Sequence, residues 1–258
     1  MTTESTAALG APPDHTFLPR GRMVGFGNGF TWISDAFGLF MAAPLAWLAF
    51  TVVFIIAALA FAMVPLIGQF LFNLVSPIIL AGVMVSAQSL ARGEAVKPED
   101  FMAGFTGKPM PLLVVGALYM AGSLIITAAF VGVVIAMLGT AFFAALLDPA
   151  RLTELYSVRI VLGLLIAALV ALALYLPLLM AYWFAVPLVQ FHDVPPVEAM
   201  KASFIGCVKN MLPFLLYGVV SLVLLLLAII PLGLGLLVMA PVLMLTMYTG
   251  YKDAFFAR

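Results

Sequence analysis

Charged side chains are scarce in this chain. Only 9% of its 258 residues are Asp, Glu, Lys or Arg, whereas 66% are hydrophobic. A soluble domain has about 25% charged and about 45–50% apolar residues. A water-soluble fold of this length could not cover its surface with so few polar groups. The scarcity excludes a soluble globular domain and predicts that lipid surrounds most of the chain.

Residues that carry chemistry are also few. Eleven basic residues balance eleven acidic ones, so no basic surface predicts nucleic-acid binding. The single cysteine, Cys207, excludes a disulfide framework. His192, Asp193 and Cys207 could meet at a metal only through a specific loop fold, because a metal site needs three or four ligands. The chain carries no nucleotide-binding, hydrolase or metalloprotease motif, so we expect neither an enzyme nor a cofactor.

Four long runs contain no ionised side chain: 36–91, 109–147, 160–192 and 210–251. A helix needs about 20 apolar residues to cross the bilayer core, so each run holds at least one span. Turn signals, a Pro followed closely by Gly, divide the first run near 65–68 and the last near 231–235. The stretch 111–147 fits either one long tilted span or a kinked one.

We therefore predict an all-α polytopic membrane helix bundle. It comprises a disordered cytoplasmic tail, residues 1–22, and a single transmembrane domain, residues 23–258. The six predicted spans lie near 44–64, 69–91, 111–141, 160–190, 212–231 and 235–251.

The basic residues predict the orientation of these spans. Lysine and arginine in short loops concentrate on the cytoplasmic side of a membrane protein. In the six-span arrangement, only Arg151 and Arg159 fall on one side. The other side holds Arg20, Arg22, Arg92, Lys97, Lys108, Lys201, Lys209, Lys252 and Arg258. This bias predicts that both termini are cytoplasmic.

A threefold internal repeat is one interpretation of the order of segments. Each unit has a short amphipathic helix, a Pro, a span, a turn and a second span with its own Pro. The units begin near residues 32, 98 and 196, and their second-span prolines are Pro77, Pro177 and Pro241. The alternative is that Pro-interrupted hairpins arise by chance in any polytopic protein. Pro98 and Pro196 suit the first position of a helix.

Two groups of polar and aromatic residues are candidates for a pocket. Asn73 and Ser76 lie one helical turn apart before Pro77, which frees a backbone carbonyl that neighbours must satisfy. The second group flanks a proline of the fourth span and consists of Tyr175, Pro177, Tyr182 and Trp183. Both groups fit either a ligand pocket or ordinary contacts: hydrogen bonds between helices for the first, and membrane-interface aromatics for the second.

Small residues recur every four positions in the third span, at Ala128, Gly132, Ala136 and Thr140. Such a face lets another helix approach closely. It predicts either an internal packing face or a surface for oligomerisation.

Three segments resemble the signature stretches of an uncharacterised proteobacterial inner-membrane family: WISDAFGLFMAAPLAW, PLLMAYWFAVPLV and ASFIGCVKNMLPFLLYG. The resemblance covers roughly residues 28–256, with the motifs in the expected order. It implies an inner-membrane location and transfers no activity or functional residue.

Two functions remain open. The first is a non-enzymatic accessory or assembly subunit that binds another membrane protein or a second copy of itself. The second is a transporter or facilitator of a neutral or lipid-like molecule. Since the predicted spans contain no carboxylate, an ion-coupled carrier is disfavoured. A polar cavity lined by Asn73, Ser76 or Tyr182 would favour transport, whereas a filled core would favour a binding partner.

Overall fold

The computed structural model describes residues 16–64, 67–139, 147 and 158–257. The segments in these ranges are helical, apart from turns, loops and one isolated antiparallel bridge between Phe17 and Phe256. The helices are α1 (Asn28–Ala42), α2 (Pro44–Ala62), α3 (Ile67–Ala91), α4 (Pro98–Phe101), α5 (Ala103–Thr106), α6 (Pro109–Leu138), α8 (Val158–Trp183), α9 (Ala185–His192), α10 (Pro196–Lys209), α11 (Met211–Ile229) and α12 (Leu236–Phe255).

Proline sets where many of these helices begin. Pro44, Pro98, Pro109 and Pro196 are the first residues of α2, α4, α6 and α10. The first turn of a helix has no acceptor for its N–H groups, so the missing N–H of proline costs nothing there. The starts predicted at Pro98 and Pro196 therefore agree with the structure.

Five helices of the described residues are long and apolar enough to cross a membrane. They are Pro44–Ala62, Ile67–Ala91, Pro109–Leu138, Ile160–His192 and Met211–Ile229. The chain is therefore an all-α membrane helix bundle, and the predicted spans lie within a few residues of these bounds. The sixth predicted span corresponds to α12, whose second half carries threonines, tyrosines, Lys252 and Asp253 and is less apolar. Six spans thus stay a prediction.

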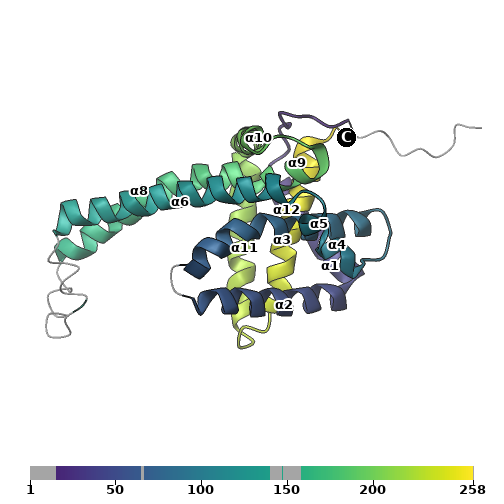
Figure 1. The fold of residues 1–258 in the computed structure, drawn as a ribbon, viewed down its shortest axis with the longest axis horizontal. Coiled ribbons are helices and arrows are strands. Elements are labelled where there is room, and N and C mark those ends of the chain that lie inside the picture. The colour runs from purple at the N-terminus through teal and green to yellow at the C-terminus, as the bar shows by residue number, and fades with distance from the viewer. Residues whose placement is uncertain (1–15, 65–66, 140–146, 148–157, 258) are drawn as a thin grey trace, which may run out of the picture.

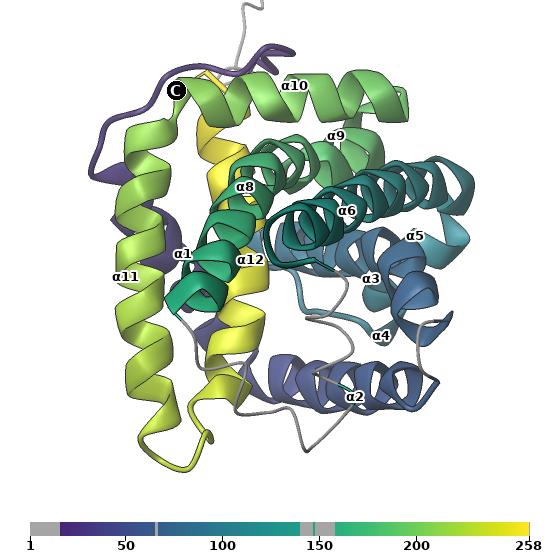
Figure 2. The same ribbon diagram turned by 90° about the vertical axis from the view of Figure 1, so that its left-hand side faces the viewer.

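Successive long helices form the hairpins α2–α3, α6–α8 and α11–α12, and these hairpins also pack on one another, most extensively through α3 against α6. The α11–α12 pair runs vertically in Figure 1, whereas α6 and α8 run across it and project away from the other helices. Figure 2, which looks along this projection, shows α11 and α12 upright beside α6 and α8. The pairs thus point in different directions instead of forming one parallel bundle.

Each short helix packs mainly on a hairpin other than the one that follows it. α4 and α5 lie on α3, α10 lies on α8, and α1 lies on α11 and α12. Counted along the chain, every short helix meets the preceding hairpin, and the first meets the last. The three predicted units therefore share the same kind of contact with a neighbouring unit, although the repeat itself stays a prediction.

Close backbone approach accompanies one of these contacts. A Cβ atom at Gly82 of α3 would lie 2.0 Å from the carbonyl oxygen of Phe101 in α4. Only glycine leaves room for that carbonyl. The short helix therefore lies directly against the backbone of α3.

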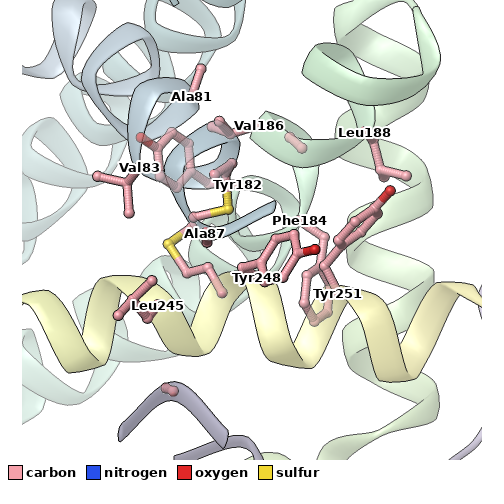
Figure 3. Packing of buried hydrophobic residues seen from close by; sticks show 14 of the residues in the cluster. Ala81, Val83, Ala87, Tyr182, Phe184, Val186, Leu188, Leu245, Tyr248 and Tyr251 are labelled. Atoms are coloured by element: carbon pink, nitrogen blue, oxygen red, sulfur yellow. The ribbon is translucent and has the colours of Figure 1, made fainter. Parts of the chain in front are cut away.

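The core gathers around α12. Its buried side chains include Leu245, Tyr248 and Tyr251, which meet side chains of α3, α8 and α9 (Figure 3). Large side chains at this centre, such as Trp32 and Phe184, are at most 2% exposed. By contrast, many apolar side chains of α2, α6, α8 and α11 are exposed, as expected for helices that face lipid.

Three boundaries differ from the prediction. Residues 16–22 of the predicted tail pack on the C-terminal end of the chain, for example through Leu18 N–H and the Phe255 carbonyl at 2.8 Å. The third span ends at Leu138 instead of 141, because Gly139 adopts a left-handed φ of 74°. The fourth span, predicted as 160–190, divides into α8 and α9 at Phe184.

Candidate functional site

Part of the predicted polar cluster does come together, between α3, α6 and α8. Ser76 Oγ lies 3.3 Å from the Tyr182 hydroxyl. The ring of Tyr119 lies 4.6 Å from the ring of Tyr182, and its hydroxyl bonds the hydroxyl of Tyr175. Tyr119 was absent from the sequence-based candidates, because a lone tyrosine in an apolar run gave no signal. We call these two neutral hydroxyl pairs, which touch through the rings of Tyr119 and Tyr182, the hydroxyl network; it joins α3 and α6 to α8.

The break in helical bonding at Pro77 is repaired locally. Pro77 has no N–H to donate to the Asn73 carbonyl, one turn earlier. Ser76 Oγ donates to that carbonyl at 3.1 Å, and the Asn73 side chain accepts from Gln69 Nε2 at 3.3 Å. These two hydrogen bonds therefore lie within α3 and satisfy polar groups of that same helix.

The remaining predicted residues lie elsewhere. Trp183 packs on Phe214 and Tyr217 of α11, with ring centroids 5.7 and 5.6 Å away. Pro177 is exposed on α8. Neither of the two grooves described below is lined by a residue of the predicted cluster. The geometry thus favours interhelical hydrogen bonding over a ligand pocket at these positions.

The break between α8 and α9 is bridged from a third helix. Ser203 of α10 accepts a hydrogen bond from Phe184 N–H at 2.8 Å and donates to the Met180 carbonyl at 2.6 Å. These are the donor and acceptor that would otherwise bond each other within one helix. A hydroxyl inserted in this way is a known cause of helix kinks, so α10 fixes the direction of α9.

Cys207 lies in the same contact between α10 and α8. It is buried, and its thiol donates to the Met180 carbonyl at 3.4 Å. Burial raises the pKa of this thiol, against a smaller lowering by the hydrogen bond with Ser203. Cys207 is therefore a structural thiol with little thiolate character.

His192, Asp193 and Cys207 do not form a metal site. His192 Nε2 lies 2.5 Å from the Tyr251 hydroxyl, and its ring stacks on Phe17 at 3.5 Å. The Asp193 carboxylate pairs with Lys108 Nζ at 2.5 Å. Among the described residues, no group of three His, Cys, Asp or Glu side chains is placed to hold a metal ion.

The small-residue face of α6 points away from the rest of the chain. Ala128, Gly132 and Ala136 are exposed, and a Cβ atom at Gly132 would meet no atom within 4 Å. The contact of α6 with α8 uses other positions, such as Gly122 against Leu178. The fourth predicted residue, Thr140, lies outside the described residues. Of the two predicted roles, internal packing is therefore not what these three residues do.

The most polar buried site ties the two ends of the chain together. The Asp253 carboxylate, near the end of α12, accepts hydrogen bonds from Arg22 Nη2 at 2.9 Å and Trp32 Nε1 at 2.9 Å. Asn28 Nδ2 donates to the same carboxylate at 2.5 Å. The Asp253 side chain is 5% exposed, so the charge is desolvated and depends on these three donors.

A second polar group secures the N-terminal strap, which we define as residues 16–27. The Asn210 side chain accepts from Val24 N–H at 2.8 Å and donates to the carbonyls of Arg22 and Gly206, both at 2.9 Å. Lys209 Nζ adds bonds to the strap carbonyls of Arg20 and Gly21. Sequence reasoning missed this clamp, because its partners lie almost the whole chain apart.

An open groove lies beside the Asp253 carboxylate, between α1, the end of α3 and the end of α12. It has a volume of about 510 Å³. We call it the terminal groove, and its lining residues are Ser34, Asp35, Gly38, Leu39, Ala91, Tyr248, Thr249, Lys252, Asp253, Phe256 and Ala257. A second groove of about 520 Å³, almost wholly apolar, lies between α6, α8 and α10.

Comparison with known proteins places the chain among inner-membrane proteins. It is 32% identical over 198 residues to the probable inner membrane protein BTH_II0599 of Burkholderia thailandensis. The match covers 74% of this chain and 71% of that protein. No protein-family model and no solved structure matches the chain. With five helices apolar enough to span a membrane, this chain belongs to the same family of bacterial inner-membrane proteins as BTH_II0599.

Proposed function

We propose that the protein is a non-enzymatic accessory or assembly subunit that binds another membrane protein through the exposed face of α6. The observation that carries the proposal is the outward direction of Ala128, Gly132 and Ala136 on a hairpin that projects from the fold (Figure 1). Larger apolar side chains, Leu124, Ile125 and Ile135, are exposed on the same face. Small residues between aliphatic ridges form the groove into which a second transmembrane helix packs.

The inner hydroxyl network supports this proposal over transport. Ser76 bonds Tyr182 between α3 and α8, and Tyr119 bonds Tyr175 between α6 and α8. Hydrogen bonds of this kind hold transmembrane helices together. They would stiffen the base of the hairpin that presents the α6 face.

We further propose that both termini lie in the cytoplasm. The ends of the described chain lie side by side, since Ala257 N–H donates to the Thr16 carbonyl at 3.1 Å. Adjacent ends require an even number of crossings, so five apolar spans imply that α12 is the sixth. The basic residues flanking the predicted spans then assign the cytoplasmic side.

Site-specific crosslinking in cells tests the partner proposal. A photoactivatable residue replaces Gly132 or, as a matched control, Ala168, an exposed position on α8 of the same hairpin. At native expression we expect position 132 to capture one defined membrane protein, or a second copy of this chain, and position 168 to capture neither. Gly132→Leu should abolish the complex, and Ala168→Leu should preserve it.

The proposal fails if position 132 yields no crosslink, or if both positions give the same scattered products. It also fails if the chain purified in mild detergent is a monodisperse monomer that carries no second protein. A reporter tag at each terminus tests the orientation separately. We expect both tags in the cytoplasm, and tags in opposite compartments would contradict the proposed orientation.

A further inference from the structure

We propose that the terminal groove binds the phosphate of a membrane phospholipid, with Lys252 as its principal cation. This inference does not depend on the proposed function. It rests on the side chains of the groove, on the charge beside it, and on the apolar surface that continues from it.

Hydrogen-bond donors and a cation share the groove. Lys252 Nζ lies over the ring of Phe256, 4.1 Å from the centroid, and none of the described carboxylates forms an ion pair with it. The hydroxyl-bearing residues Ser34 and Tyr248 line the same groove. An ammonium and hydroxyl donors are the groups that bind phosphate oxygens in proteins.

A second cation strengthens the positive charge. Burial lowers the pKa of Lys252, and the positive charge of Arg92, just after α3, lowers it further. Arg92 does not line the groove, but a bound anion near two cations that repel each other stabilises both. The Asp35 and Asp253 carboxylates also line the groove, so its charge is mixed, as is that of a headgroup that carries both a phosphate and an ammonium.

The walls of the groove are apolar, which favours a lipid over free phosphate. Gly38, Leu39 and Ala91 line it together with the polar groups. Phe30, Phe37 and Met41 of α1 are 56%, 45% and 58% exposed, and helical spacing places them on one stripe that includes Ser34. A headgroup in the groove could therefore lay its acyl chains along this stripe.

Native mass spectrometry of the purified full-length chain in detergent tests the proposal with three probes. These are dioleoyl phosphatidylethanolamine, dioleoylglycerol (the same chains without phosphate) and inorganic phosphate. We expect the phospholipid to bind, dioleoylglycerol to bind at least tenfold more weakly, and inorganic phosphate not to displace the lipid. A charge-assisted hydrogen bond contributes about 1.5–3 kcal/mol, which corresponds to roughly ten- to a hundredfold in affinity.

Two variants locate the site. Lys252→Gln should weaken phospholipid binding about tenfold or more. Gly38→Leu should do the same by filling the groove, and a Cβ atom there meets no atom within 4 Å, so we expect the variant to fold. Lys201→Gln is the control, because Lys201 is exposed on α10, pairs with Glu198 and lines the other groove.

The proposal is overturned if Gly38→Leu or Lys252→Gln binds the phospholipid as the unaltered chain does, or if Lys201→Gln loses as much affinity as Lys252→Gln. Equal binding of dioleoylglycerol would also overturn it, because acyl chains alone would then be recognised. Displacement of the lipid by inorganic phosphate would assign the groove to the free anion. Equal thermal midpoints of the three variants would show that any loss reflects the site.

Discussion

Replacing Asp253 with Asn removes the buried negative charge near the end of α12 while keeping the shape of the side chain. In the folded protein this carboxylate is 5% exposed and accepts from Arg22, Asn28 and Trp32. Breaking a buried ion pair by removing one partner costs about 3–5 kcal/mol. Arg22 is 28% exposed and can turn toward water, so we expect the lower end, about 3 kcal/mol.

Asp193→Asn provides a matched control. Asp193 also pairs with a cation, Lys108, but its side chain is 80% exposed. An exposed pair contributes about 0–1 kcal/mol. Its backbone φ is 54°, a conformation that Asn tolerates well, so the substitution adds no strain.

The buried Cys207, the single cysteine of the chain, supplies the assay. A thiol-reactive dye in detergent fluoresces when unfolding exposes it, which gives a thermal midpoint. For a chain of this size 1 kcal/mol shifts the midpoint by about 2–4 °C. We expect Asp253→Asn to lower it by about 6–12 °C and Asp193→Asn by less than about 4 °C. Equal small shifts for the two variants would refute the argument that Asp253 is a buried, three-donor acceptor.

The same assay checks four further substitutions. Gly82→Ala places a Cβ atom 2.0 Å from the Phe101 carbonyl oxygen and should lower the free energy of unfolding by at least about 1–3 kcal/mol. Gly218→Ala is its control: a Cβ atom there has no atom within 4 Å, so the change should be neutral or stabilising by up to about 1 kcal/mol. Asn210→Ala removes two hydrogen bonds to the strap and one to the Gly206 carbonyl of α10, and it should cost roughly 2–4 kcal/mol, with faster trypsin cleavage in the strap; unchanged cleavage would contradict its role. Tyr182→Phe removes one interhelical hydrogen bond and should cost only about 0.6 kcal/mol; a loss above about 2 kcal/mol would show that the network is more cooperative than its pairwise bonds.

Local patterns explain which parts of the fold were predictable. The spans follow from hydropathy, and helix starts such as Pro98 and Pro196 follow from a proline that needs no donor. The division of α8 from α9 at Phe184 could not be placed in this way. Pro187 predicts only a disturbance nearby, and the bridging hydroxyl belongs to Ser203 on another helix.

The candidate site was less predictable, because its residues gain meaning only from their partners. The spacing of Ala128, Gly132 and Ala136 is the same whether the face packs inside the fold or outside it. In the sequence, Asp253 follows the last predicted span beside Lys252 and resembles an ordinary charged residue at the membrane interface. Its donors come from the first part of the chain, and no local rule links residues more than 200 positions apart.

The placement of α1 on α11 and α12 has a consequence for biogenesis. Trp32 is synthesised long before α11 and α12, the helices that bury it. The first amphipathic helix therefore cannot reach its final position until the later hairpins are inserted. The fold is complete only when α11 and α12, which are synthesised last, pack on α1, which is synthesised first. A ribosome that stops before Met211 would leave a chain whose early segments are made but whose opening helix has no place to dock.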